Sequence, residues 1–491
     1  MEPKQPLSEV LSSNTSIIDR FREHPFAALE TYKFFNQTEA TLREYSDAVI
    51  DGDEDVQAPS FCYDEIDSAE LIKVRDSLTE LLTELPIDRP LTLEETLIRE
   101  LITNRLDEVG LMLLTKSQSE LSEDDPNYAL ISFQLGQNFR EIYGSPDNDH
   151  FNGVLGYRLA MLSKIEGVAE APENIKNAWT YIRDHLPTDL PIEQPYQMKV
   201  ETMEWYKAQL ESRLEPTRTA VSEAISNGDI LLNSDGKLDA KNIVQATLIS
   251  LAARGFDGWH VELTDRTGID TTQAKKTIYI PQSRVMSLDE FDRVIQAHEI
   301  DEHVARRENG DASSIKVLQG VGLHGYLAFE EGNGKINEGL LLGKVNNEAS
   351  AFGYFLNGGL ALGLDRDGNG RNFRETHELV WRINLVASYL LNQDASEDRV
   401  RRHIRNATKL VHRLFRGTDG KTAGVVFTKD AMTYYLGGVE VMRKWDEDML
   451  LAEEERVKEH LLERSAKFYP TRMSHRQLAQ AAFEQRSQEI K

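Results

Sequence analysis

The stretch Val294–Gly310, VIQAHEIDEHVARRENG, decides how the chain must fold around a candidate site, because it carries His298 and His303. These histidines are five residues apart, in the pattern H-E-x-x-x-H, whereas the familiar metal-binding helix motif H-E-x-x-H places them four apart. On a regular α-helix at about 100° per residue, His303 lies roughly 140° around the axis from His298, too far to share one ion. A π-type turn, with i→i+5 hydrogen bonds, absorbs the extra residue. A metal site here therefore requires a locally widened helix.

The residue types of this motif suit metal chemistry. Two neutral imidazoles and one carboxylate leave the fourth position of a tetrahedral zinc site open for water. Glu299, directly after His298, is the natural base for that water. Two other interpretations remain open. The first is a carboxylate-rich iron site, because the i, i+4 spacing that suits one is shared by His298 with Glu302 and by Glu299 with His303. The second is an ordinary polar helix in which Asp301 and Glu302 are solvated.

Helical patterns dominate the chain up to the motif. The segment 61–212 has helical periodicity, with a capping box formed by Thr92 and Glu95. Farther on, GWHVELTD and KKTIYIP are short β-branched and aromatic runs bounded by Gly and Pro, which predicts strands. A second capping box, Ser287 with Glu290, precedes the motif helix. We expect an α+β, predominantly helical fold in which a small sheet packs on the motif helix, after an all-helical N-terminal region.

Composition shifts divide the chain into four predicted segments. Residues 1–60 form an N-terminal segment ending in an acidic linker, and residues 61–212 form the helical region. Residues 213–445 carry the motif and form the predicted catalytic domain. Residues 446–491 are a charged helical tail, which we interpret as a solvated helix or an arm that docks a partner.

The overall charge narrows the classes of partner. With 56 Lys+Arg against 82 Asp+Glu, the formal net charge is -26, which disfavours nucleic acid and anionic membranes as partners. The single cysteine, Cys62, excludes an intrachain disulfide and favours a reducing compartment. No apolar signal core or long uncharged apolar run is evident. We therefore expect a cytoplasmic location, whereas the oligomeric state does not follow from the sequence.

A third metal ligand is expected downstream of the motif. The stretch Gly320–Gly343, GVGLHGYLAFEEGNGKINEGLLLG, carries Glu330, Glu331 and Glu338 in apolar, Gly-rich surroundings. A carboxylate buried there needs a partner, and a metal ion supplies one. The same positions could instead be exposed on a helix interrupted by glycine.

Three ordered motifs then resemble a known family. HEIDEH, RRENG and GLHGYLAFEEG look like the H-E-x-x-x-H metallopeptidases, which include the microtubule-associated tyrosine carboxypeptidases. Bacterial relatives are the flavohemoglobin expression-modulating proteins with a Gln-Glu-Gly-Leu-Ala motif. The stretch LFRGTDGKTAGVVFTKDAMTYYLGG resembles the family's Phe-Arg-Gly and Phe-Thr-Lys-Asp segments. The similarity spans roughly Leu248 to Trp445.

The resemblance implies a zinc-dependent peptide hydrolase with a gluzincin-like catalytic core. In the family the glutamate before the motif glycine is the third zinc ligand, which implies His298, His303 and Glu331 as metal ligands here. Glu338 stays the alternative third ligand, and Glu299 is the implied general base. The implied activity is that of a carboxypeptidase, which removes one C-terminal residue, aromatic in the best-known members.

A carboxypeptidase also needs a cation for the terminal carboxylate of its substrate. Arg416 and Lys429, in the two resembling segments, are the candidates for that role. Tyr326, Tyr434 and Tyr435 are candidates for stabilising an oxyanion, or else residues that only pack. We therefore predict substrate binding by Arg416, Lys429 and Tyr326.

The chain also departs from the family pattern. Glu331 is followed by Gly332, Asn333 and Gly334 instead of Gly-Leu-Ala, and an Asn-Gly pair is a poor continuation of a helix. Asp301 replaces a small residue of the motif and adds negative charge near the site. Two alternatives to an active peptidase therefore stand: an inactive or regulatory interaction protein that keeps the fold, and a non-peptidase metalloenzyme such as an iron-dependent one.

Overall fold

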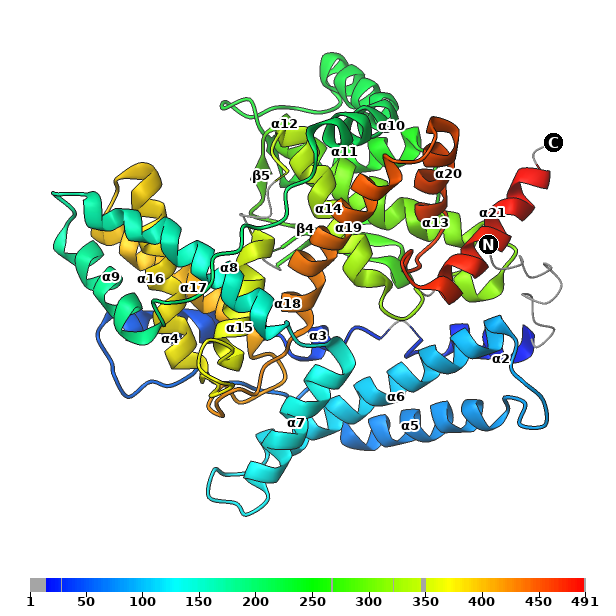
Figure 1. Ribbon diagram of the computed structural model, residues 1–491. Helices are drawn as coiled ribbons and strands as arrows, with labels where there is room; N and C mark the ends of the chain where they lie inside the picture. The colour runs from blue at the N-terminus through cyan, green and yellow to red at the C-terminus, as the bar shows by residue number, and fades with distance from the viewer. Residues whose placement is uncertain (1–14, 28, 266–267, 321, 346–349, 490–491) are drawn as a thin grey trace.

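The computed structural model describes residues 15–489, apart from positions 28, 266–267, 321 and 346–349. The protein is predominantly helical, with 65% helix and 4% strand, as the sequence predicts. Figure 1 shows the helices gathered around a central region that holds the small strands. No helix of the described chain combines the length and apolar character needed to cross a bilayer.

The N-terminal region contains helices and loops alone among the residues described before Gly228. The long helix α6 begins at the capping box of Thr92 and Glu95 that the sequence predicts, and it packs against both α5 and α7. Helix α4 lies apart from these three and packs against α17. The bounds are α2 Thr15–Glu23, α3 Thr31–Phe34, α4 Glu39–Ile50, α5 Ser68–Thr83, α6 Leu93–Ser119 and α7 Tyr128–Tyr143.

A second helical group surrounds α16, on the left of Figure 1. Helix α16 packs against α9, α15 and α17, and α15 also contacts α8. The bounds are α8 Asn148–Leu162, α9 Glu173–His185, α15 Ser350–Leu362, α16 Phe373–Asn392 and α17 Glu397–Leu414.

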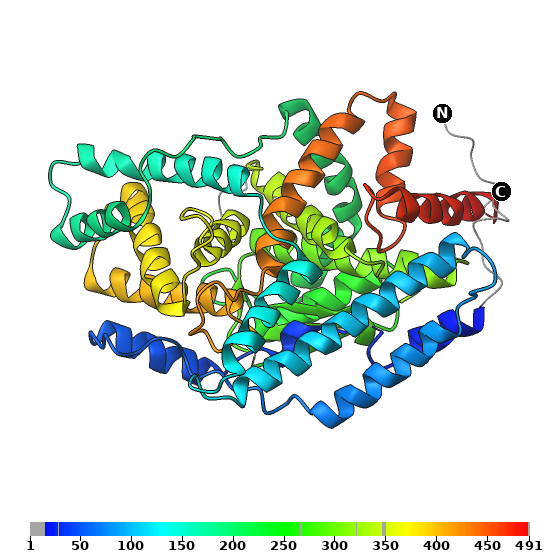
Figure 2. The ribbon, with the colours of Figure 1, turned by 60° about the horizontal axis from the view of Figure 1, so that its bottom comes forward.

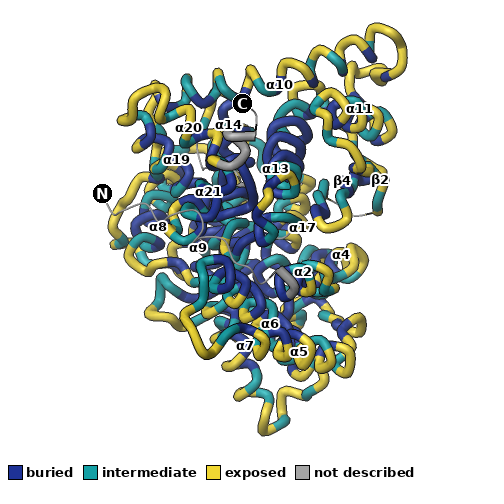
Figure 3. Tube along the Cα trace, turned by 90° about the vertical axis from the view of Figure 1, so that its right-hand side faces the viewer, coloured by how far each residue is buried: buried dark blue, intermediate teal, exposed yellow. Residues whose placement is uncertain are grey.

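The motif helix lies in the third group, between α10, α11 and α14. Helix α14 packs against it along one side, and α19 packs on the far side of α14. In Figure 3 the buried residues concentrate where α13 and α14 lie, whereas the outer end of α10 is exposed. The bounds are α10 Val200–Asn227, α11 Ala240–Ala253, α12 Leu288–Phe291, η3 Asp292–Val304, α13 Ala305–Asp311, α14 Tyr326–Leu342, α18 Lys429–Ala431, η5 Met432–Leu436, α19 Gly437–Asp448, α20 Glu453–Glu463 and α21 Met473–Glu489.

The strands form a small mixed sheet beside the motif helix. Strand β4 (Thr277–Pro281) is central: it pairs in parallel with β2 (His260–Thr264) and antiparallel with β3 (Asp270–Thr272). Two isoleucines of β4 share one hydrophobic core with apolar residues of the motif helix. This core includes Ile278, Ile280, Phe291, Ile295, Ile300 and Val304. Helix α11 lies against β2 and β4, and β3 contacts the motif helix directly. A separate two-stranded pair joins β1 (Leu238–Asp239) to β5 (Val285–Met286).

The charged tail is not a solvated arm, so that interpretation is wrong. Leu462, Phe468 and Leu478 are buried in the same core as residues of α5 and α6. Helix α21 packs against α6, and Figure 2 shows α21 at the same end of the molecule as α2. The charges of the tail misled the sequence analysis because many of them are paired with buried partners. The predicted boundary at residue 212 falls within α10, which continues without a break to Asn227.

The contact between α14 and the start of α19 depends on glycine, and this can be tested. A Cβ added at Gly437 would lie 1.9 Å from the carbonyl oxygen of Ala328, so Gly437→Ala must push the two helices apart. Overpacking of this kind costs about 1–3 kcal/mol, measured as a fall in the free energy of unfolding in urea. Gly353→Ala is the matched control, because a Cβ at Gly353, inside α15, meets no atom within 4 Å. Equal stability of the two variants would contradict this packing.

Candidate metal centre

The motif helix has the widened turn that the histidine spacing requires. Ser287 caps its start by accepting a hydrogen bond from the backbone N–H of Glu290, 3.2 Å away. After α12 the backbone adopts π-helical geometry for 13 residues, Asp292–Val304, before it returns to α-helix. The rings of His298 and His303 consequently lie on one side, with centroids 5.0 Å apart. The prediction of a π-type turn is confirmed.

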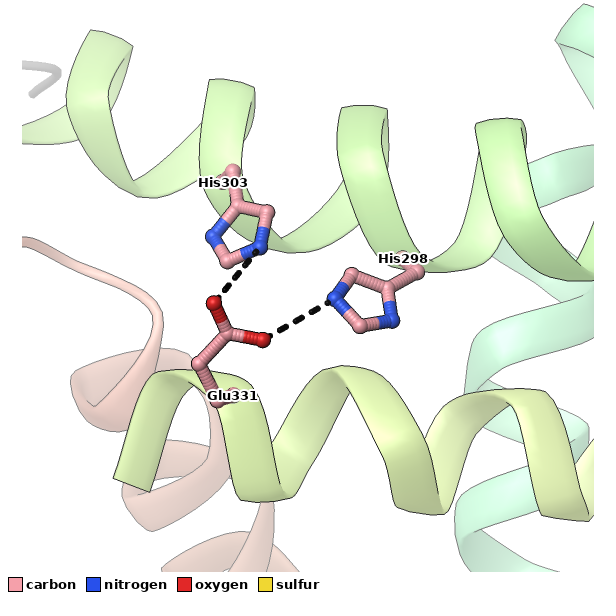
Figure 4. Close-up of side chains that lie close together, drawn as sticks. All are labelled: His298, His303 and Glu331. Atoms are coloured by element: carbon pink, nitrogen blue, oxygen red, sulfur yellow. Dashed lines mark ion pairs between the residues drawn. The ribbon is translucent and has the colours of Figure 1, made fainter. Parts of the chain in front are cut away.

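Glu331 joins the two histidines from the neighbouring helix α14 (Figure 4). Its Oε2 lies 3.4 Å from Nε2 of His298, and its Oε1 lies 3.8 Å from Nε2 of His303. One ligand atom from each residue lies within 4.8 Å of the others, so this trio could hold a metal ion. Two ligands about 2.1 Å from one tetrahedral ion lie about 3.4 Å apart, which matches the shorter contact.

The other ring nitrogen of each histidine is held by a second glutamate. Nδ1 of His298 lies 2.6 Å from Oε1 of Glu338, and Nδ1 of His303 lies 2.6 Å from Oε1 of Glu330. A carboxylate accepts the Nδ1–H, which leaves the Nε2 lone pair free for a metal and fixes the orientation of the ring. Glu338, the alternative ligand, therefore lies on the opposite side of the His298 ring from Glu331. Its position is that of an orienting partner.

Without a metal ion, the imidazole of His298 holds its proton strongly, whereas Glu331 stays ionised. Burial and the nearby Lys335 act to lower the pKa of His298, yet its hydrogen bonds to Glu331 and Glu338 outweigh them and raise its pKa to about 10. Burial would raise the pKa of Glu331, but the charges of the two histidines lower it to about 2. A metal ion must therefore displace protons from the imidazoles when it binds.

Glycine explains how α14 passes so close to the histidines. A Cβ at Gly334 would lie 2.9 Å from the ring of His298, and one at Gly332 would lie 2.4 Å from the carbonyl carbon of Gly437. The expectation that Asn333 and Gly334 are a poor helix continuation is wrong, because α14 runs unbroken through them. Asn333 donates a hydrogen bond to Glu302, which compensates for the weak helix propensity.

Asp301 and Glu302 are not solvated, so the alternative interpretation of an ordinary polar helix is wrong, and they do not join the metal trio. Both side chains are fully buried. Glu302 pairs with Arg306 and accepts a hydrogen bond from Asn333. Asp301 forms ion pairs with three arginines, at 3.1 Å to Arg213, 2.9 Å to Arg254 and 3.0 Å to Arg464. Burial would raise the pKa of Asp301, but the three guanidinium groups hold it well below its usual value. Its charge is therefore neutralised locally.

Glu299 faces the cavity in front of the histidines. It lines this cavity together with His298 and His303, and its side chain is largely buried. The hydroxyl of Thr271, on strand β3, donates a hydrogen bond of 2.5 Å to its Oε2. The sheet thus fixes one carboxylate oxygen of Glu299 and leaves the other for a ligand.

The three predicted substrate-binding residues line the same cavity, which has a volume of about 1440 Å³. Nη1 of Arg416 lies 3.9 Å from Asp430. Lys429 has no carboxylate within ion-pair distance in the part of the chain that the structure describes, and its ammonium lies 4.7 Å above the ring of Tyr32. Tyr326 forms part of the wall, beneath the ammonium of Lys467 at 4.7 Å.

The structure places two tyrosines that the sequence offers as oxyanion candidates in different surroundings, whereas Tyr32 and Thr271, which also line the cavity, escaped the sequence analysis. Tyr434 lines the cavity and accepts a hydrogen bond from Arg413, whereas Tyr435 packs in the core against Phe355. A second π-helix, Met432–Leu436, sets the directions of the two tyrosines. No spacing rule in the sequence signals that widened turn, because its residues carry no metal-ligand pattern.

Comparisons with protein-family models, curated proteins and solved structures gave no match for this chain. The case for the site therefore rests on its residues and their geometry.

The close approach of Gly334 to His298 gives a direct test of the site. In Gly334→Ala the new methyl group would displace the imidazole, and such losses of ligand orientation weaken metal affinity about 10–100-fold. Zn²⁺ affinity, measured by competition with a chromophoric chelator, should fall accordingly. Gly110→Ala serves as control, because a Cβ at this position within α6 meets no atom within 4 Å. Unchanged affinity in Gly334→Ala would exclude His298 as a ligand.

Proposed function

We propose that this protein is a zinc-dependent peptide hydrolase, a carboxypeptidase that removes a C-terminal residue. The observation that carries the proposal is the convergence of His298, His303 and Glu331 beside Glu299 on one wall of a large cavity. A ligand set of two imidazoles and one carboxylate is that of catalytic zinc sites, which keep one position open.

The residues present fit a zinc ion. His298 and His303 would hold it through Nε2, and Glu331 through a carboxylate oxygen, while Glu338 and Glu330 keep the rings oriented. Bound there, Zn²⁺ would act as a Lewis acid, polarising the scissile carbonyl and making a water molecule more acidic.

Glu299 has the position of the general base and acid. Its free carboxylate oxygen would accept a proton from the attacking water, while Thr271 holds the other oxygen in place. As the peptide C–N bond breaks, Glu299 would return that proton to the departing amine. The products are a shortened peptide and one free amino acid.

Basic side chains in the cavity would bind the C-terminal carboxylate of a peptide substrate. Lys429, without an ion-pair partner among the described residues, and Arg416, only loosely paired with Asp430, would bind the terminal carboxylate. Tyr326, Tyr32 and Tyr434 give the cavity aromatic walls, which suit a large, aromatic terminal side chain. Such a substrate is a peptide or protein C-terminus, with neither nucleic acid nor membrane as partner.

A cytoplasmic location is part of the same proposal. The single cysteine, Cys62, is exposed and unpaired, and its thiol lies 2.9 Å from Asp64. A free exposed thiol suits a reducing compartment.

Metal analysis of the purified protein tests the proposed cofactor. We expect about one zinc per chain in the wild type and its loss in His298→Ala, because two remaining ligands hold zinc weakly. His185→Ala is the control, since His185 is exposed and contacts the carbonyl of Tyr181 outside the cavity. Iron in place of zinc would favour a non-peptidase metalloenzyme, and absence of any metal would favour an interaction protein.

Release of C-terminal residues from a peptide library tests the proposed reaction. Glu299→Gln should retain zinc but lower kcat about 10²–10⁴-fold, the usual contribution of general acid–base catalysis. Glu290→Gln is the matched control, because Glu290 lies on the preceding turns of the same helix and pairs with Arg284. Equal turnover in wild type and Glu299→Gln would remove Glu299 from this role.

A further inference from the structure

The segment between α20 and α21 lies against the back of the motif helix. Arg464 extends from this segment, and its side chain is only 8% exposed. Its Nη2 donates a hydrogen bond to the backbone carbonyl of Asp301 and also lies 3.0 Å from Oδ1 of the same residue. Its Nη1 lies 3.5 Å from Oε2 of Glu302. One guanidinium group thus binds both the main chain and the side chains of the widened turn.

The backbone of the same segment is attached to the end of the motif helix. The side-chain amide of Asn309 donates a 2.6 Å hydrogen bond to the carbonyl oxygen of Arg464. The segment is therefore fixed to α13 independently of the Arg464 side chain.

Arg464 differs from the other two arginines that neutralise Asp301. Arg213 in α10 and Arg254, the residue after the end of α11, contact Asp301 through its carboxylate and not its main chain. Arg464 alone of the three also binds its main-chain carbonyl. Asp301 lies between His298 and His303 in the chain, within the π-helical stretch that brings their rings together. A hydrogen bond to the main chain at Asp301 therefore helps to fix the positions of His298 and His303 relative to each other.

We propose that Arg464 is a positioning residue of the metal centre. It holds the backbone of the π-helix at Asp301 and so keeps His298 and His303 converged on Glu331. The inference rests on the proposed metal site and deepens it. It also makes the C-terminal segment, which lies beyond the span of the family resemblance, a part of that site.

The physical reason is the cost of the widened turn. π-helical turns are rare because their geometry is less favourable than that of the α-helix, so they persist where other contacts support them. Relaxation toward 3.6 residues per turn rotates His303 away from His298. Loss of Arg464 should therefore act on metal affinity while the rest of the fold stays intact.

Zn²⁺ affinity of three variants, measured with a competing chelator, tests the inference. Arg464→Met should weaken binding about 10–100-fold, as loss of a ligand-orienting contact does. Arg464→Lys, which keeps one donor and the charge, should recover part of the loss. Arg254→Met is the matched control: it removes a guanidinium group from Asp301 without a main-chain contact, and it should change affinity far less.

A second control separates positioning from general destabilisation. Leu462→Ala removes a buried side chain near the end of α20, two residues before Arg464, so it should lower Tm without changing zinc affinity. In the metal-free protein, amide hydrogen exchange between residues 298 and 304 should become faster in Arg464→Met but not in Arg254→Met. That readout is independent of metal and of activity.

The outcomes distinguish the two proposals. Absence of zinc binding by the wild type contradicts the proposed function, and hydrogen exchange then still reports on Arg464. Equal zinc affinity in wild type and Arg464→Met overturns the role of Arg464 alone. Equal losses in Arg464→Met and Arg254→Met would show that the charge of Asp301 matters and the main-chain contact does not.

Discussion

One extra residue between two histidines is the constraint on which this site depends. A regular α-helix would point His298 and His303 in different directions, and the π-helical stretch Asp292–Val304 removes that mismatch. The surrounding structure accommodates the wider turn on two sides. In front, α14 comes close to the His298 ring through Gly334, and behind, three arginines surround Asp301. The rare backbone geometry is thus supported by both its neighbours.

The motif helix also separates two electrostatic environments. On the cavity side, each histidine lies between a carboxylate that can bind metal and one that orients its ring. Away from the cavity, Asp301 and Glu302 are buried but compensated by arginines. A buried carboxylate left unpaired costs several kcal/mol, so both environments need complete sets of partners. Because arginines neutralise Asp301 and Glu302, these two residues add little negative charge at the metal trio. The negative charge there comes from four glutamates, Glu299, Glu330, Glu331 and Glu338.

The sequence predicts those features of the fold that have local causes. The capping box at Thr92, the N-cap at Ser287, strands β2 and β4 and the widened turn all follow from spacing or residue type. The reciprocal half of the capping box predicted at Ser287 is absent, because the Glu290 side chain pairs with Arg284, and strand β3 was not predicted. The separate roles of Glu331 and Glu338 do not, because both lie on α14 and only the position of the His298 ring between them distinguishes ligand from support. The buried tail was missed for a similar reason: its charged residues look solvated until their partners on other helices are known.

The cavity is assembled from segments at both ends of the described chain. Tyr32 contributes to its wall from α3, and Lys467, Tyr469 and Arg472 contribute from the loop before α21. During synthesis on the ribosome, the nascent chain can form the early helices well before these last residues emerge. The cavity consequently forms late in synthesis, and a nascent chain that has not yet reached residue 467 lacks part of its wall. A ligand that needs this wall cannot bind before residues 467–472 have emerged.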